Sequence, residues 1–281
     1  MSRARIAFLG PAGTFSEEAA VGYAAGSGEL VPFASIHAVV EAVETAATER
    51  AIVPIENSLE GSVTATVDLL IHDTELRIVA ELPLEVRHQL LGRPGTELGD
   101  VRIVISHPQA IGQCRRFLDR SLAEVEVIAA LSTAAAVGQM MATEGRHTAA
   151  IATRRAAEIY GAAVLASEIQ DNDANVTRFV VLAREDAPRT GRDKTSLCFT
   201  LPDARQAGAL HRALACFAEA GISLTRLESR PSKQALGYYV FLIDLEGHRL
   251  DPDVAEAIRR LQELARSVKI FGSYPRWELE L

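Results

Sequence analysis

A glycine-rich turn near the N-terminus brings together groups that suit an anion. Residues 10–17 read GPAGTFSE and follow a short apolar run. Glycine lets the backbone approach a ligand closely, and the first N–H groups of a helix are open to an anion. Thr14 and Glu17 also have the spacing of a capping box, so the segment taken alone favours a tight turn with an N-cap. It matches neither a P-loop nor a dinucleotide fingerprint.

Two more polar segments come directly after apolar runs. Residues 54–58 (PIENS) place Glu56 and Asn57 at the end of a predicted strand, where side chains face the cleft of a parallel α/β sheet. A polar loop that caps the next helix is the alternative, and both interpretations stay open. Residues 106–109 (SHPQ) end another strand, with Pro108 well placed in the first turn of a helix. This start is either a second anion site or a plain cap made by Ser106 or His107.

A fourth polar segment, residues 175–179 (NVTRF), precedes the last strand of the first part of the chain. Arg178 has the planar guanidinium that clamps a carboxylate through two hydrogen bonds, and Thr177 offers a hydroxyl donor. A solvated entry into the strand is the simpler interpretation when this segment is considered alone.

Several classes of protein are disfavoured by composition. The net charge is −8, whereas a nucleic-acid binder usually carries a basic excess. The three cysteines contain no Cys-x-x-Cys pair, and the seven histidines lack metal-ligand spacing, so neither a disulfide framework nor a metal site is expected. No Gly-x-Ser-x-Gly elbow supports a hydrolase. The apolar run at residues 6–9 is too short for a signal peptide, and no segment is long enough to span a membrane, so we expect a cytoplasmic protein.

The elements that carry the four segments alternate between strand and helix. This alternation is typical of a parallel α/β sheet, and an extended stretch at 76–91 is suited to cross between two α/β lobes with a cleft between them. The predicted strands cover residues 6–9, 51–55, 102–106, 125–130, 149–152 and 179–183. The predicted helices cover residues 14–25, 36–47, 63–71, 109–118, 133–142 and 153–160.

A second, smaller domain is predicted after a linker. Residues 184–194 are charged, contain a proline and a glycine, and have no apolar periodicity. We therefore assign residues 1–183 to one domain and residues 195–281 to another. The second has the order βαββαβ of a ferredoxin-like fold, with strands at 196–200, 223–229, 238–245 and 268–272 and helices at 207–220 and 254–267.

The four polar segments, in this order, resemble those of the prephenate dehydratase family. The second domain resembles an ACT regulatory domain through residues 208–211 (GALH) and 228–231 (ESRP), although Ala207 stands where family members often have proline. The resemblance implies two lobes like those of type II periplasmic binding proteins. It also implies conversion of prephenate to phenylpyruvate, carbon dioxide and water without a cofactor, by a homotetramer that phenylalanine inhibits. The chain has no room for the chorismate mutase domain found in some members, so we expect a monofunctional enzyme.

Given this reaction, we assign roles to individual residues. We expect Thr177 to donate to the departing hydroxyl, Arg178 to hold a carboxylate and Phe179 to pack behind the site. The expected substrate-binding residues are Thr14, Phe15, Ser16, Glu56, Asn57, Ser106 and Gln109. The expected phenylalanine site comprises Gly208, Ala209, Leu210, His211, Glu228, Ser229, Arg230 and Pro231.

Three alternatives stay open at this point. Arogenate dehydratase performs the same chemistry on the transaminated substrate, and the motifs do not separate the two. A non-catalytic amino-acid sensor would combine a binding-protein core with an ACT domain. The ACT domain itself could serve only dimerisation.

Overall fold

The chain folds into two compact units. The computed structural model describes residues 4–202, 206–233 and 237–277. One unit comprises Met1–Thr64 with Leu82–Phe179, and the other comprises Ala65–Glu81 with Val180–Leu281. Strands β5 (Arg77–Glu85) and β11 (Val176–Ala183) run from one unit into the other. The domain boundaries expected at residues 183 and 195 stay a prediction.

The first sheet has the strand order β2-β1-β3-β11-β5, with the short β4 paired to β3. β1 is parallel to both β2 and β3, and Ile6, Ala7 and Phe8 in β1 are buried. Burial on both faces explains why this strand is a continuous apolar run in the sequence. The remaining bounds are β1 (Ala4–Leu9), α1 (Phe15–Ala24), β2 (Gly28–Phe33), α2 (Ile36–Glu44), β3 (Arg50–Asn57), β4 (Gly61–Ser62) and α3 (Thr64–His72).

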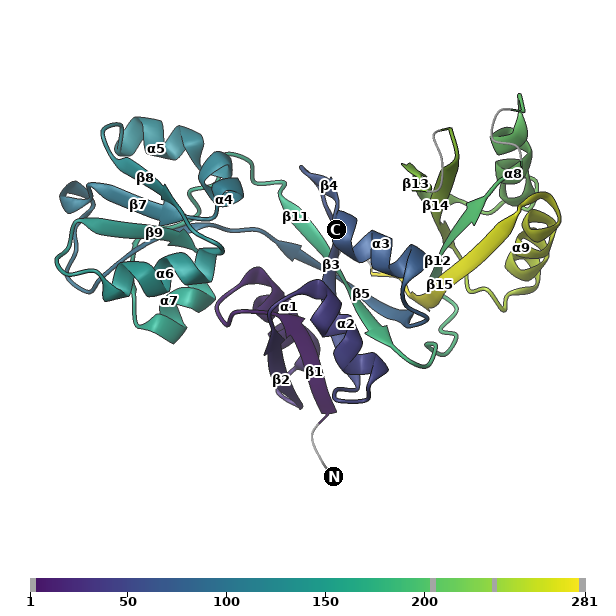
Figure 1. Ribbon diagram of the computed structural model, residues 1–281, viewed down its shortest axis with the longest axis horizontal. Coiled ribbons are helices and arrows are strands. Elements are labelled where there is room, and N and C mark those ends of the chain that lie inside the picture. The colour runs from purple at the N-terminus through teal and green to yellow at the C-terminus, as the bar shows by residue number, and fades with distance from the viewer. Residues whose placement is uncertain (1–3, 203–205, 234–236, 278–281) are drawn as a thin grey trace. The chain divides into compact units, whose positions relative to one another are not determined.

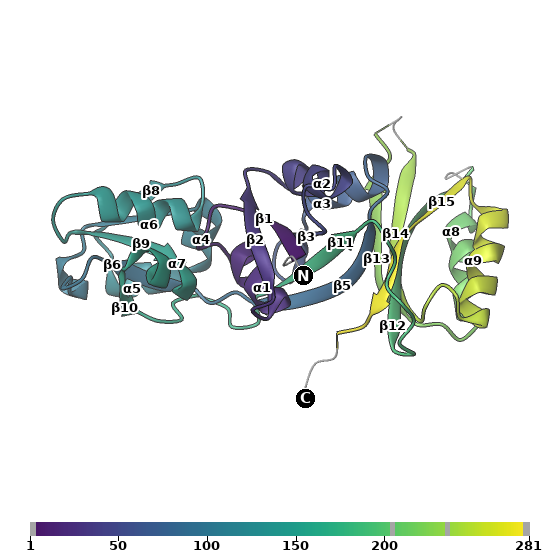
Figure 2. The same ribbon diagram turned by 90° about the horizontal axis from the view of Figure 1, so that it is seen from below.

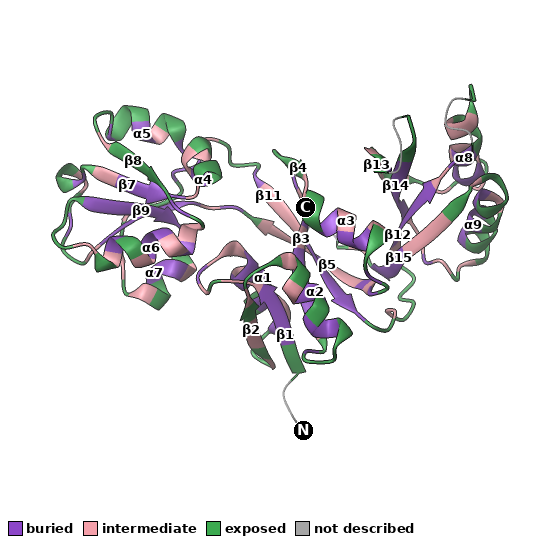
Figure 3. Ribbon diagram, in the orientation of Figure 1, coloured by how far each residue is buried: buried purple, intermediate pink, exposed green. Residues whose placement is uncertain are grey.

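The second sheet has the order β10-β6-β9-β7-β8 and carries helices on both faces (Figure 1). Ala110, Cys114 and Leu118 pack in one core on one face, and the helices α6 and α7 pack in another on the other face. Figure 3 shows the resulting burial along β7 and β9. The bounds are β6 (Gln89–Gly92), η1 (Leu98–Asp100), β7 (Ile103–Ser106), α4 (Pro108–Gln113), α5 (Arg115–Ser121), β8 (Glu126–Ala129), α6 (Thr133–Ala142), β9 (Thr148–Ala152), α7 (Arg154–Tyr160) and β10 (Ala163–Ala166).

The chain crosses between these two sheets twice, through residues 86–88 and 167–175. We call residues 4–64 with 176–179 the first lobe and residues 89–166 the second lobe. Both lobes belong to the same compact unit. The two-lobed α/β organisation predicted from the sequence is confirmed.

The third sheet, with the order β13-β14-β12-β15, forms the βαββαβ domain predicted from the sequence. Both of its helices cover one face, as Figure 2 shows, and Phe199 and Ile243 of the sheet share a core with Phe217 of α8. The bounds are β12 (Asp193–Thr200), α8 (Ala209–Ala218), β13 (Leu224–Pro231), β14 (Tyr239–Glu246), α9 (Pro252–Leu264) and β15 (Ser267–Pro275).

Tertiary contacts account for two departures from the predicted elements. The helix expected over residues 109–118 breaks at Cys114, because Asp171 donates its N–H to Gln113 O at 2.7 Å and its carboxylate accepts the N–H of Arg116 at 3.1 Å. The helix expected to reach residue 267 ends at Leu264, because the N–H of Arg266 donates to Thr200 O of the neighbouring strand.

Candidate functional site

A cavity of roughly 350 Å³ lies between the two lobes of the first unit. Side chains from both lobes and from the crossing segment line it, and they gather at the ends of strands and the starts of helices. The lining residues are Leu9, Gly10, Thr14, Phe15, Ser16, Ala34, Asn57, Val86, His88, His107, Gln109, Ala110, Gln113, Leu131, Ser132, Thr133 and Thr177.

Three helices begin at this cavity. Thr14 caps α1 by accepting the N–H of Glu17 at 3.4 Å, and Ser132 caps α6 by accepting the N–H of Ala135 at 3.0 Å. His107 caps the short α4 through Nδ1, which accepts the N–H of Gln109 at 3.3 Å. Since the first N–H groups of a helix have no acceptor within it, α1 and α6 both present positive potential to a bound anion.

The cavity lining contains no Asp, Glu, Lys or Arg among the residues that the structure describes. Its titratable side chains are His88 and His107. Burial lowers the pKa of His88, whose residue is 2% exposed, so this imidazole is neutral at pH 7. An anion in this cavity therefore meets hydroxyls, amides, ring N–H groups and helix starts instead of formal charges.

Asn57 fixes the hydroxyl of Thr177. The Oδ1 atom of Asn57 accepts the backbone N–H groups of Leu59 at 2.9 Å and Glu60 at 3.1 Å, which sets the orientation of the amide. Its Nδ2 atom then donates to Thr177 Oγ1 at 2.9 Å and to Asn175 Oδ1 at 2.8 Å. Because Thr177 Oγ1 accepts from Asn57, the hydroxyl keeps its own proton for another acceptor, and Thr177 lines the cavity.

The amide chain continues from Asn175 to His88. Asn175 donates through Nδ2 to Gln113 Oε1 at 3.0 Å, and the same oxygen lies 2.9 Å from His88 Nε2. Since that oxygen can only accept, the ring proton of His88 is on Nε2. The Phe15 ring contacts His88 edge-on, with 5.4 Å between ring centroids. The chain therefore joins both lobes around one side of the cavity.

Six of the ten residues expected at the catalytic site line the cavity, namely Thr14, Phe15, Ser16, Asn57, Gln109 and Thr177. The others lie outside the lining. Arg178 pairs with Glu56 at 3.0 Å, Ser106 donates its hydroxyl to Ile151 O at 2.6 Å, and Phe179 is buried. Their expected roles stay predictions.

The lining also includes residues that the motifs did not indicate. His88, Gln113, Ser132 and Thr133 belong to segments without a functional spacing of their own. For Ser132, the pattern of serine before a predicted helix at 133–142 was a detectable N-cap signal. His88 and Gln113 meet only through the tertiary fold, 25 residues apart in the chain.

The residues expected to bind phenylalanine lie on two elements of the second unit. Gly208 is the N-cap of α8 with φ +77°, and Ala209, Leu210 and His211 form the first turn. Glu228, Ser229, Arg230 and Pro231 end the edge strand β13.

Charged groups gather around this end of β13. Glu228 pairs with Arg226 at 2.6 Å and with Arg230 at 3.2 Å. Arg230 also pairs with Asp68 of α3 at 3.3 Å, and Lys233 pairs with the same carboxylate at 2.6 Å. We call these five residues the β13 charge row. Carboxylates and guanidinium groups are both present in it.

Two features of the described residues bear on the kind of site. Over residues 4–202, 206–233 and 237–277, no cluster of three or more His, Cys, Asp or Glu side chains is arranged to hold a metal ion. In the same ranges, no helix has the length and apolar character needed to cross a membrane.

Two family models match successive parts of the chain. The family model for prephenate dehydratase matches residues 6–187, and that for the ACT domain matches residues 199–263. A prephenate dehydratase of Mycolicibacterium vanbaalenii is 42% identical over 286 residues, covering 96% of this chain and 90% of that protein. The chloroplastic arogenate dehydratase/prephenate dehydratase 2 of Arabidopsis thaliana is 41% identical over 285 residues, covering 98% and 73%. The crystal structure of an Arthrobacter aurescens prephenate dehydratase in complex with L-Phe matches with a TM-score of 0.89 and 38% identity, covering 97% of this chain and 90% of that one.

Proposed function

The chain belongs to the prephenate dehydratase family, and we propose that its interlobe cavity converts prephenate to phenylpyruvate, carbon dioxide and water. The observation that carries the mechanism is the Thr177 hydroxyl at the cavity, which accepts a hydrogen bond from Asn57 and keeps its proton to donate.

The chemistry of the substrate explains why so few reactive groups line the cavity. Prephenate loses its ring carboxylate as carbon dioxide, and the electron pair of that C–C bond enters the ring. The ring C–O bond breaks as the ring becomes aromatic, and the departing oxygen takes one proton to become water. The enzyme has to hold a dianion and assist the departing oxygen, so positioned donors are sufficient.

The structure suggests how these tasks are divided. The starts of α1 and α6 are suited to hold the two carboxylates, because both present backbone N–H groups to the cavity. Thr177 donates to the departing oxygen as negative charge develops there, while Asn57 holds the hydroxyl in place. Gln109, Ser16 and Phe15 orient the substrate. Arg178 is outside the cavity lining. It influences the site through its ion pair with Glu56 and through Thr177, the residue that precedes it in the chain.

Regulation by L-phenylalanine through the ACT domain completes the function. We place the effector at the Gly208 turn and the end of β13, which carry backbone N–H groups and paired charges of both signs. An amino acid carries a carboxylate and an ammonium, so it needs both kinds of partner.

We further propose a cytoplasmic homotetramer. The exposed edge of β13 supports self-association, because an unpaired edge strand offers backbone groups to a second chain. Light scattering coupled to size exclusion tests the assembly, and a monomer at micromolar concentration would contradict it.

The experiment that tests the reaction is the formation of phenylpyruvate from prephenate, followed by its absorbance in alkali. Arogenate is assayed in parallel, with phenylalanine as the product. We expect prephenate to be the better substrate, because the described lining offers no carboxylate to the ammonium of arogenate. Binding of either compound without turnover would indicate a sensor and contradict the proposed function.

A further inference from the structure

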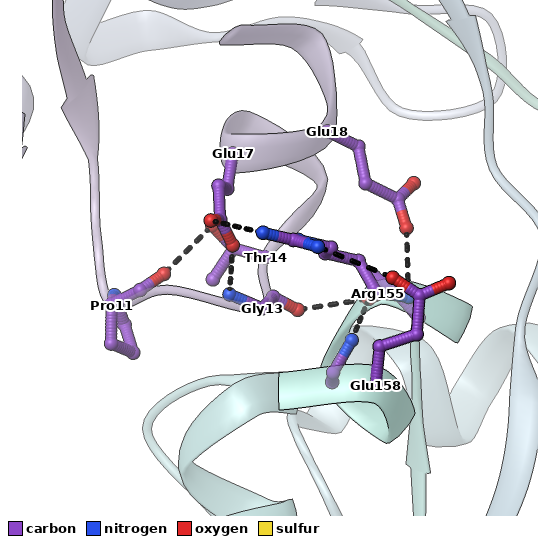
Figure 4. A network of polar contacts seen from close by, with 9 residues as sticks. Pro11, Gly13, Thr14, Glu17, Glu18, Arg155 and Glu158 are labelled. Atoms are coloured by element: carbon purple, nitrogen blue, oxygen red, sulfur yellow. Dashed lines mark hydrogen bonds and ion pairs between the residues drawn. The ribbon is translucent and has the colours of Figure 1, made fainter. Parts of the chain in front are cut away.

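Gly13 lies where the first lobe docks on the second, and its peptide groups bond to both lobes (Figure 4). Its N–H donates to the carboxylate of Glu17 in α1. In a capping box, Glu17 would instead accept the N–H of the N-cap residue Thr14. Its C=O accepts the hydroxyl of Thr153 from the second lobe at 2.9 Å. Thr153 is fully buried, and the same hydroxyl oxygen accepts the N–H of Ala156 at 3.0 Å as the N-cap of α7.

Arg155 extends these contacts across the lobes. Its guanidinium pairs with Glu17 at 3.5 Å, and its backbone N–H donates to Glu18 at 3.3 Å. There is also no room for a side chain at Gly13. A Cβ atom there would lie 3.1 Å from both Cα and Cβ of Ala156, in a backbone conformation with φ +87°. The backbone of Gly13 in the first lobe therefore packs directly against helix α7 of the second lobe.

We propose that Thr153, Glu17 and Arg155 are positioning residues that clamp the Gly13 peptide and so set the spacing of the cavity. None of the three lines the cavity. Gly13, however, directly precedes Thr14, Phe15 and Ser16, which do. The clamp fixes the start of α1 in the first lobe relative to the start of α6 in the second, and a substrate with two carboxylates needs both.

This inference rests on the proposed function and predicts a particular kinetic pattern. Asn57 and Thr177 are both held within the first lobe, so loosening the clamp leaves the donor to the departing oxygen in place. Substrate binding then has to fix the spacing that the clamp no longer fixes. We expect KM to rise while kcat stays nearly constant, the opposite of the pattern expected for a change at Thr177.

Thr153→Val is the principal test, with Thr153→Ser and Ser35→Ala as controls. Valine keeps the shape of threonine but removes the hydroxyl, and we expect KM for prephenate to rise about tenfold or more with kcat within about threefold. Serine restores the hydroxyl and should return KM to within about threefold. Ser35 caps α2 in the same way, by accepting the N–H of Ala38 at 3.2 Å, without joining the lobes. Ser35→Ala therefore lowers stability through a lost N-cap while leaving KM and kcat unchanged.

A second pair of variants keeps the test decisive if Thr153→Val fails to fold. Gly13→Ala adds the Cβ that meets Ala156, whereas Gly26→Ala adds one at a similar φ of +80° with no atom within 4 Å. Both carry the backbone strain, but we expect only Gly13→Ala to raise KM. The inference is overturned if KM of either folded clamp variant stays at the wild-type value, or if the matched control raises it equally. Absence of turnover in the wild-type enzyme would instead overturn the proposed function.

Discussion

The interlobe cavity and the β13 charge row differ in whether their side chains carry formal charges. The described lining of the cavity has no charged side chain, and Asn57, Gln113 and Thr177 in it are linked by hydrogen bonds that pass through Asn175. The β13 charge row consists of arginine, lysine and carboxylate side chains in contact. The cavity suits a ligand with two carboxylates and no ammonium, whereas the row suits a zwitterion.

The difference has a physical reason. A cation placed in a cavity lowers its energy by pairing with a nearby carboxylate, and a substrate dianion would then have to replace that partner. Helix starts carry partial charges fixed by the backbone, and side-chain amides carry partial charges without a net charge. Neither needs a counter-ion. In the β13 charge row, Arg230 already shares two carboxylates, so an amino acid there has to exchange ion pairs.

The largest predicted effect is at Thr177, which lines the uncharged cavity. Replacing it by valine removes the donor to the departing oxygen, and we expect kcat to fall about 10²–10³-fold with little change in KM. Thr177→Ser keeps a hydroxyl and should retain most of the activity. Steady-state kinetics with prephenate measure both, and a rise in KM with unchanged kcat would mean that Thr177 only binds substrate.

A new negative charge in the cavity is the next test. Gln109→Glu places a carboxylate in the lining, and we expect kcat/KM for prephenate to fall on the order of 10–100-fold through repulsion of the dianion. Gln109→Met loses the same amide without adding charge and should fall less. Equal losses in the two variants would show that the neutrality of the lining is unimportant.

Gly208→Val tests the other element of the expected phenylalanine site, the turn before α8. Gly208 has φ +77°, which a β-branched residue tolerates poorly, so we expect the turn to rearrange. The phenylalanine concentration that gives half inhibition should rise at least about tenfold, with turnover in the absence of phenylalanine largely intact. A variant inhibited as strongly as the wild type would place the effector elsewhere.

The smallest effect concerns His88 and the stability of the neutral cavity. Because burial lowers the pKa of His88, the unfolded chain binds the extra proton first as the pH falls. The stabilisation from the neutral imidazole is thus complete above about pH 6.5 and decreases below it, by at most about 1.4 kcal/mol per pH unit. Urea unfolding of the wild type and of His88→Gln between pH 5 and 8 measures this. The same pH dependence in both proteins would contradict a neutral, buried His88.

Local patterns predicted two of the strands in which burial is complete or nearly so. β1 and β9 are apolar runs because both of their faces are covered. The edge strand β2 was not predicted, since it is only partly buried and contains Pro32, which an edge position tolerates. The break in the helix at Cys114 depends on Asp171, a partner that no local pattern indicates.

Local sequence patterns likewise indicated only part of the candidate site. The motifs indicated Asn57 and Thr177 because Asn57 ends β3 and Thr177 lies at the start of β11, and both line the cavity. His88 and Gln113 connect to Thr177 through Asn175 and Asn57, and Glu17 connects to Thr153 through Gly13. Single contacts in these chains join residues as many as 140 positions apart, so sequence spacing carries no signal for them.

A crystal structure of the Thr177→Val variant with bound prephenate would locate the departing hydroxyl. We expect the ligand in the interlobe cavity, with its carboxylates at the starts of α1 and α6 and its ring hydroxyl facing the side chain at position 177. Prephenate bound with that hydroxyl directed away from position 177, or bound outside this cavity, would contradict it.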